Sequence, residues 1–170
     1  FTMMNNARLG VGVQGVALAE RAYQHARAYA HERRQGRTAD YTGQGMVAIA
    51  EHPDVRRMLA TMRGLTDAAR GVCYLTAASL DEAARADDRE ARNAAYERAS
   101  LLTPLAKAFS TDIAVEVASL GVQVHGGMGF VEETGAAQFY RDARILPIYE
   151  GTNGIQAMDL VLRKLPLSGG

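Results

Sequence analysis

The segment around Glu150 combines a single carboxylate with features of a general-base site. Glu150 follows the apolar run at residues 145–149 and comes directly before Gly151 and Thr152, a residue type that caps helices. A glutamate held among apolar side chains is partly desolvated, which raises its pKa towards neutrality and suits it to remove protons. An acid before a helix also stabilises the positive end of the helix dipole without any catalytic role. The residues alone leave both interpretations open.

A second candidate is the glycine-rich run His125-Gly126-Gly127-Met128-Gly129-Phe130. Three glycines in four residues permit positive φ angles and let a ligand approach bare backbone. Exposed backbone N–H groups in such a turn favour an anionic group such as a phosphate. Glycines also end many helices as a C-cap followed by a tight turn. On this motif alone, we favour the C-cap over the anion site.

Other common catalytic and metal sites lack their residues in this sequence. The histidines at positions 25, 31, 52 and 125 form no His-x-x-x-His pair, and no Gly-x-Ser-x-Gly motif occurs. Cys73 is the single cysteine and cannot form an internal disulfide. It lies on an apolar helical stripe, so we expect a packed core thiol rather than a nucleophile. We therefore expect no metal site.

Three long helices must position these candidates. Their apolar residues recur at spacings of three and four, over residues 7–34, 53–84 and about 102–124. The first helix contains Gly10, Gly12 and Gly15, and Gly36 follows shortly after it; such a cluster favours close approach of another helix over close approach of a ligand. We expect the glycine-rich apolar surface of this helix to be covered by self-association. The fold class is all-α, an antiparallel helical bundle.

The connections and the shorter helices follow from proline, glycine and capping signals. Residues 35–50 are expected to form a loop and residues 85–92 a solvated turn. Pro53 suits a first helical turn, whereas Pro104 should kink the third helix or mark its start. Two shorter helices are expected at about residues 135–144 and 152–164, the second capped by Thr152 and closed by Pro166. A weak strand-like alternation covers residues 145–149.

The composition is that of a globular core without a charged partner. Of the 170 residues, 48% are hydrophobic and 22% charged, and 19 basic residues balance 19 acidic ones. This balance gives no electrostatic reason to expect nucleic acid or an anionic membrane surface as a partner. No apolar stretch approaches the roughly 18 residues of a membrane span, and no signal peptide is recognisable. We expect one soluble, cytoplasmic domain over residues 1–170, an excerpt of a longer chain because helical periodicity begins almost at Phe1.

Taken together, these residues resemble the C-terminal helical domain of flavin-dependent acyl-CoA dehydrogenases. The resemblance runs nearly end to end, and its most specific segments are Gln123-Val124-His125-Gly126-Gly127-Met128-Gly129-Phe130, Arg141-Asp142-Ala143-Arg144 and Ile148-Tyr149-Glu150-Gly151-Thr152. The order and spacing of these segments make the resemblance specific. The continuation from Thr152 to Leu160 is most similar to the branch with bacterial broad-range and 3-methylmercaptopropionyl-CoA dehydrogenases.

The resemblance implies a protein of three parts: an N-terminal helical domain, a middle β-domain and this bundle. In the family, the glutamate at the position of Glu150 removes the α-proton of the acyl thioester while the β-hydride passes to FAD. The product is a trans-2-enoyl-CoA, and the electrons then leave to an electron-transfer flavoprotein. Family members form homodimers or homotetramers through the bundle, with the flavin between subunits. Some family members carry the base on the first helix of this domain instead; residues 2–8 contain no carboxylate here, so the resemblance implies Glu150 as the base.

The resemblance also implies which residues bind the ligands. Arg33 matches the arginine that holds the flavin diphosphate of the neighbouring subunit, and Gln123, Gly126 and Gly127 match the turn at the adenosine diphosphate. The other implied cofactor residues are Thr152 and Gln156, and the implied substrate residues are Arg8, Tyr149 and Gly151. Two alternatives stay open: a helical assembly module without chemistry, and a flavin oxidase or alkylation-response relative of the same fold. The retained Tyr-Glu-Gly-Thr segment favours the dehydrogenase.

Overall fold

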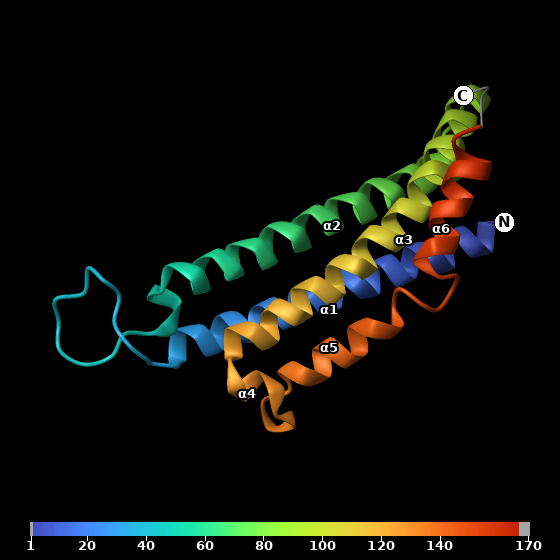
Figure 1. Ribbon diagram of the computed structural model, residues 1–170. Helices are drawn as coiled ribbons and strands as arrows, with labels where there is room; N and C mark the ends of the chain where they lie inside the picture. Colours follow the sequence, from blue (N-terminus) through green and yellow to red (C-terminus); the bar gives the residue numbers. More distant parts are fainter. Residues whose placement is uncertain (1, 167–170) are drawn as a thin grey trace.

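The computed structural model describes residues 2–166, and all regular secondary-structure elements in this part of the chain are helices or helical turns (Figure 1). The long helices are α1 (Thr2–Glu32), α2 (Pro53–Arg85) and α3 (Arg89–His125). The shorter ones are α4 (Gly127–Phe130), α5 (Ala136–Ile145) and α6 (Asn153–Asp159), with the helical turns η1 (Ile49–Glu51), η2 (Glu132–Thr134) and η3 (Leu160–Lys164). Within this part of the chain, β pairing is limited to one isolated bridge between Arg34 and Ala48. The predicted all-α class is confirmed.

The long helices pack side by side in an up-down-up order (Figure 1). Helix α2 runs antiparallel to both α1 and α3, and α5 returns along α1 and α3 in the direction of α2. Helix α6 then packs on α3 close to the beginning of α1. This arrangement confirms the predicted bundle. No helix of the described residues is both long enough and apolar enough to cross a membrane.

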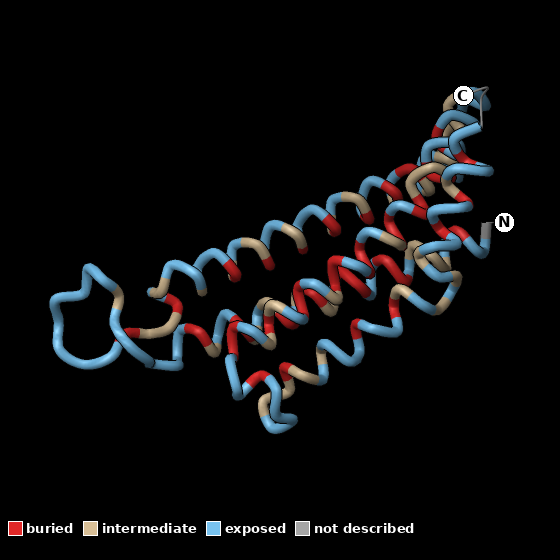
Figure 2. Tube along the Cα trace, in the orientation of Figure 1, coloured by how far each residue is buried: buried red, intermediate tan, exposed pale blue. Residues whose placement is uncertain are grey.

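The core consists largely of small side chains on the facing sides of the long helices (Figure 2). On α1 the buried residues recur at three and four, namely Ala19, Ala22, Ala26 and Ala30, and α2 contributes Met58, Met62, Ala69 and Cys73. The Cys73 Sγ lies 3.3 Å from the Ser110 Oγ, and burial raises the pKa of the thiol. Cys73 is therefore the packed core thiol that its place on the apolar stripe predicted.

Two glycines of α1 allow its close contact with α3. A Cβ atom at Gly12 would lie 2.9 Å from the Ala106 carbonyl oxygen, and one at Gly15 would lie 2.7 Å from the Ser110 carbonyl oxygen. A Cβ atom at Gly10 would meet no atom within 4 Å. Gly12 and Gly15 are thus covered by α3 of the same chain, and these two glycines give no reason to expect self-association.

Three local expectations differ from the structure. The turn between α2 and α3 is shorter than residues 85–92, because the Asp88 carboxylate caps α3 by accepting a hydrogen bond of 2.9 Å from the Ala91 N–H. Pro104 is buried inside a continuous α3 and does not mark its start. Residues 145–149 form no strand: Ile145 is the last residue of α5, residues 146–148 form a turn, and Tyr149 lies in a bend. In contrast, Pro53 stands in the first turn of α2 as predicted.

Candidate functional site

The predicted site residues fall into two groups at opposite ends of the bundle. Arg8 and residues 149–156 lie where α6 meets α1 and α3, whereas Arg33 and residues 123–127 lie where α1 and α3 end. The distance between the two groups can be taken along α3. Lys107 contacts Asn153 of the first group, and it lies 18 residues before His125, which adjoins the second group. That separation corresponds to about 27 Å at the helical rise of about 1.5 Å per residue. One chain therefore carries two separate candidate sites.

The turn that carries Glu150 has an unusual backbone. Glu150 is the one residue other than glycine with a positive φ in the described chain, at 53°, and Gly151 follows with a φ of 86°. The Asn153 N–H closes the turn by donating a hydrogen bond of 3.0 Å to the Pro147 carbonyl. Such left-handed residues persist where their surroundings hold them, and they cluster at functional sites.

Thr152 and Gln156 fix the backbone on the α6 side of this turn. The Thr152 Oγ1 accepts a hydrogen bond of 3.3 Å from the Ile155 N–H, so the predicted helix cap is confirmed. Gln156 is buried, and its Nε2 donates to the carbonyl oxygens of Gly151 at 3.1 Å and Glu150 at 3.5 Å. The Gln156 Oε1 is buried without a partner among the described residues. Gln156 thus supports the turn from inside the protein.

Asn153 ties the same turn to α3. Its Oδ1 accepts a hydrogen bond of 2.9 Å from the Nζ of Lys107, a fully buried residue. Its Nδ2 donates to the Asp112 Oδ1 at 2.7 Å and to the Thr111 Oγ1 at 3.0 Å. Burial lowers the pKa of Lys107; nearby Asp112 opposes this shift. Sequence reasoning missed this network, and its one signal is a lysine within a largely apolar stretch of α3.

Two further contacts join the α6 region to α1. The Tyr149 hydroxyl donates a hydrogen bond to the Gln14 Oε1. The Arg8 Nη1 lies 2.8 Å from the Oδ2 of Asp159, which is 6% exposed. The Arg8 Nε is buried and has no partner in the described chain. The predicted substrate residues Arg8 and Tyr149 therefore lie at the same end of the bundle as Glu150.

Glu150 itself is exposed, contrary to the expected desolvation. Ile145 and Ile148 are 53% and 51% exposed, so they do not close over the carboxylate, and Leu146 is buried in the core. The Glu150 carboxylate has no hydrogen bond or ion pair with any described residue, and the cap of α6 is Thr152 instead. The structure thus presents Glu150 as a free carboxylate on a fixed turn.

The three glycines after α3 differ in what the structure requires of them. Gly126 is the C-cap of α3 with a φ of 61°, so the C-cap interpretation is confirmed for this residue. A Cβ atom at Gly129 would lie 2.3 Å from the Val122 carbonyl oxygen, which packing forbids. A Cβ atom at Gly127 would meet nothing within 4 Å. Neither backbone conformation nor packing in this chain requires glycine at position 127, which faces open space.

A stack of rings brings the end of α1 against this glycine turn. The His125 ring stacks on His25 with centroids 4.7 Å apart and on Tyr29 with centroids 4.3 Å apart. The His125 Nδ1 bonds to the Gly121 carbonyl at 2.7 Å, and burial lowers the pKa of this histidine. Arg33 follows Tyr29 by one helical turn, with its N–H 2.8 Å from the Tyr29 carbonyl oxygen.

The groups at this end fit a diphosphate. Arg33, Gln123 and Gly127 are exposed, and the Arg33 guanidinium has no hydrogen bond or ion pair within the described residues. A free guanidinium and an open glycine backbone, both at this end of the bundle, are donors of the kind that phosphate oxygens bind. The predicted cofactor residues Arg33, Gln123, Gly126 and Gly127 are thus compatible with the diphosphate of FAD. Within the described chain, no cluster of three metal-ligating side chains exists.

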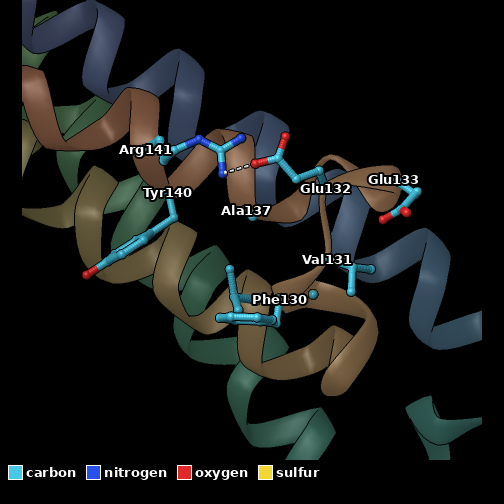
Figure 3. A pocket seen from close by; sticks show the side chains of 9 residues that line it. Phe130, Val131, Glu132, Glu133, Ala137, Tyr140 and Arg141 are labelled. Atoms are coloured by element: carbon cyan, nitrogen blue, oxygen red, sulfur yellow. Dashed lines mark ion pairs between the residues drawn. The ribbon is translucent and has the colours of Figure 1, made fainter.

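An apolar groove of about 680 Å³ opens beside the glycine turn (Figure 3). Phe130 and Tyr140 form aromatic parts of its wall, and Glu132 and Arg141 form an ion pair of 3.1 Å at its edge. Phe130 is 84% exposed. Sequence reasoning did not predict this groove, because it depends on how η2 and α5 fold back towards α3.

Comparisons with known proteins match nearly the whole chain. The family model described as "Acyl-CoA dehydrogenase, C-terminal domain" matches residues 1–165. The chain is 60% identical over its whole length to 3-methylmercaptopropionyl-CoA dehydrogenase of Ruegeria pomeroyi, and it spans 29% of that protein. A subunit of the caffeyl-CoA reductase–Etf complex of Acetobacterium woodii is 32% identical over 89% of this chain, which spans 34% of that subunit.

The fold is also that of solved structures. The structure of acyl-CoA dehydrogenase from Bacillus anthracis, complexed with FAD, superposes with a TM-score of 0.78 at 30% identity. The match covers 94% of this chain and 27% of that one. The similarity to 3-methylmercaptopropionyl-CoA dehydrogenase confirms the branch that the residues after Thr152 indicated.

Proposed function

Because the chain belongs to the acyl-CoA dehydrogenase family, whose C-terminal domain its residues 1–165 match, we propose that it is the C-terminal part of an FAD-dependent acyl-CoA dehydrogenase. The enzyme would oxidise an acyl-CoA to a trans-2-enoyl-CoA, with Glu150 as the α-proton base. The observation that carries the proposal is the free carboxylate of Glu150 on a left-handed turn held by Thr152, Asn153 and Gln156.

In the proposed reaction, the Glu150 carboxylate takes the α-proton of the acyl thioester. The Glu150 N–H has no hydrogen-bond partner within the described chain, so it is available to donate to the thioester oxygen as negative charge develops there. FAD, when bound, supplies the acceptor for the β-hydride. Because Glu150 is exposed in this chain, the rest of the enzyme and the substrate must exclude water from it.

The two ends of the bundle would serve different parts of the ligands. Arg8, Tyr149 and Gly151 would lie at the acyl-CoA, with Thr152 at the flavin side and Gln156 behind the turn. Arg33, Gln123, Gly126 and Gly127 would hold the diphosphate and adenosine parts of FAD. The separation of about 27 Å along α3 supports an arrangement in which the second group binds the cofactor of a neighbouring subunit. We accordingly propose a homodimer or homotetramer, with an electron-transfer flavoprotein as electron acceptor.

The test uses the full-length protein loaded with FAD. Anaerobic mixing with butyryl-CoA, octanoyl-CoA and 3-methylmercaptopropionyl-CoA should bleach the flavin absorbance with at least one substrate and yield the corresponding trans-2-enoyl-CoA. A flavin oxidase would instead turn over in air with hydrogen peroxide as product. No bleaching with any of these thioesters would favour an assembly role without chemistry.

A further inference from the structure

We propose that Lys107 is a positioning residue for Glu150, acting from α3 through Asn153 on the turn that carries the carboxylate. The inference rests on the proposed function, since it assigns Lys107 a part in holding the base. Lys107 does not touch Glu150. Its influence passes through one side chain and a short stretch of backbone.

Lys107 is a costly residue at its position. Lys107 is completely buried, with 0% of its surface exposed to solvent. Its Nζ donates a hydrogen bond of 2.9 Å to the Asn153 Oδ1. Burying an ammonium is unfavourable, and an apolar side chain of similar volume is often equal or better for stability. Stability alone therefore does not account for a lysine here. The need for a hydrogen-bond donor to the Asn153 Oδ1 accounts for it.

The donor fixes the orientation of the Asn153 amide. Lys107 offers only N–H groups, so the Asn153 Oδ1 must face it, while the Nδ2 faces the Asp112 carboxylate at 2.7 Å. The Nδ2 is also 3.2 Å from the Ala108 carbonyl oxygen. A cation on one side and acceptors on the other leave a single favourable orientation.

Asn153 transmits this constraint to the base. Its backbone N–H donates to the Pro147 carbonyl at 3.0 Å, which closes the chain around Glu150. Glu150 and Gly151 inside this closure both have positive φ angles, of 53° and 86°. A glutamate relaxes readily from the left-handed region unless its neighbours prevent it. Release of Asn153 should therefore let the carboxylate move away from its productive position.

The first test is Lys107→Met in the full-length, FAD-loaded protein. We expect the limiting rate of anaerobic flavin bleaching by butyryl-CoA, or by whichever thioester the wild type prefers, to fall about 10- to 100-fold, the usual effect of a small displacement of a catalytic group. FAD content and the midpoint of thermal unfolding should hold or rise, and the acyl-CoA concentration at half-maximal rate should change less than the rate. Arg57→Met, which removes an exposed cation of α2, is the matched control.

The second test exchanges the groups around Asn153. Asn153→Asp places a carboxylate against Asp112 and should slow bleaching, whereas Asp112→Asn keeps an acceptor and should change it little. The double variant Asn153→Asp/Asp112→Asn restores a donor–acceptor pair and retains the acceptor for Lys107. We expect it to recover at least part of the rate that Asn153→Asp loses. A purely structural role for the pair would restore stability without restoring the rate.

The outcomes separate this inference from the proposed function. If Glu150→Gln bleaches normally, the base assignment fails and the role of Lys107 fails with it. If Glu150→Gln is inactive while Lys107→Met bleaches as fast as wild type, only the positioning role is overturned. If Lys107→Met does not fold, the exchange at positions 153 and 112 decides: no recovery of rate in the folded double variant overturns the proposal.

Discussion

In the glycine turn, the structure of this chain gives no reason for a glycine at position 127. Gly126 needs its positive φ and Gly129 needs its close approach to α3, but Gly127 faces open space. In the full-length protein, we predict that Gly127→Ala weakens FAD binding about tenfold or more, since a steric misfit of about 1.4 kcal/mol has that effect. Thermal unfolding of the isolated chain should be unchanged. Unaltered FAD affinity would remove Gly127 from the cofactor site.

We predict that His125 makes the stability of the bundle depend on pH. Burial lowers the pKa of this histidine in the folded state, so below the unfolded value of about 6.5 the unfolded chain binds the proton first. The stabilisation linked to neutral His125 should therefore be fully present well above pH 6.5, and the free energy of unfolding should fall as the pH drops below about 6.5. Urea unfolding from pH 7.5 to 5.5 should show this slope, which cannot exceed about 1.4 kcal/mol per pH unit for one proton.

His125→Phe keeps an aromatic ring in the stack and removes the titrating group, so it should flatten this dependence on pH. His31→Gln, at the exposed end of α1, is the control and should leave the slope as in the wild type. An equal slope in the wild type and His125→Phe would show that other groups carry the acid sensitivity.

At the scale of elements, the contact between α1 and α3 sets how closely the bundle packs. Gly15→Ala would place a Cβ atom 2.7 Å from backbone of α3, and we predict a loss of about 1–3 kcal/mol of stability from overpacking. Gly10→Ala lies in the same helix with open space around it and should gain up to about 1 kcal/mol from helix propensity. Urea unfolding of both variants measures the difference, and equal effects would contradict the packing argument.

The helices could be predicted from the sequence because their signals are local. Apolar spacing located the three long helices, Pro53 marked the start of α2, and Thr152 marked the cap of α6. The faces of α3 were less predictable. Leu105 and Phe109, which continue the apolar spacing, are 40% and 39% exposed, while Lys107 between them is fully buried.

The candidate site was predictable only in part, because some of its contacts join residues that are far apart in the sequence. Glu150 stood out by its neighbours in the sequence, but its support comes from Asn153 and from Lys107, which lies 46 residues before Asn153. Such tertiary contacts leave no periodic signal. The expected burial of Glu150 failed because the apolar residues of one segment do not by themselves enclose a side chain of that segment.

For the whole molecule, the placement of the two candidate sites argues that this chain alone is not a flavin-binding unit. The glycine turn and the base turn lie at opposite ends of the bundle, and the chain spans 29% of the 3-methylmercaptopropionyl-CoA dehydrogenase it matches. We predict that the isolated 170 residues fold as a helical bundle but bind FAD weakly. Fluorescence titration with FAD checks this, with circular dichroism as the control for folding. Tight stoichiometric binding would contradict the proposed division of the cofactor site.

The most direct test of the account is Glu150→Gln in the full-length, FAD-loaded protein. The substitution keeps the size of the side chain and removes the proton acceptor, and the exposed Asp142, which bonds to Gln138 on α5, is not placed to replace it. Glu116→Gln, on the exposed face of α3, is the matched control.

Stopped-flow absorbance during anaerobic mixing with the preferred acyl-CoA gives the rate of flavin bleaching. We predict that Glu150→Gln retains its FAD and its thermal stability but bleaches about 10²–10⁴-fold more slowly, the usual contribution of a positioned general base. Bleaching as fast as in the wild type would show that Glu150 is not the base.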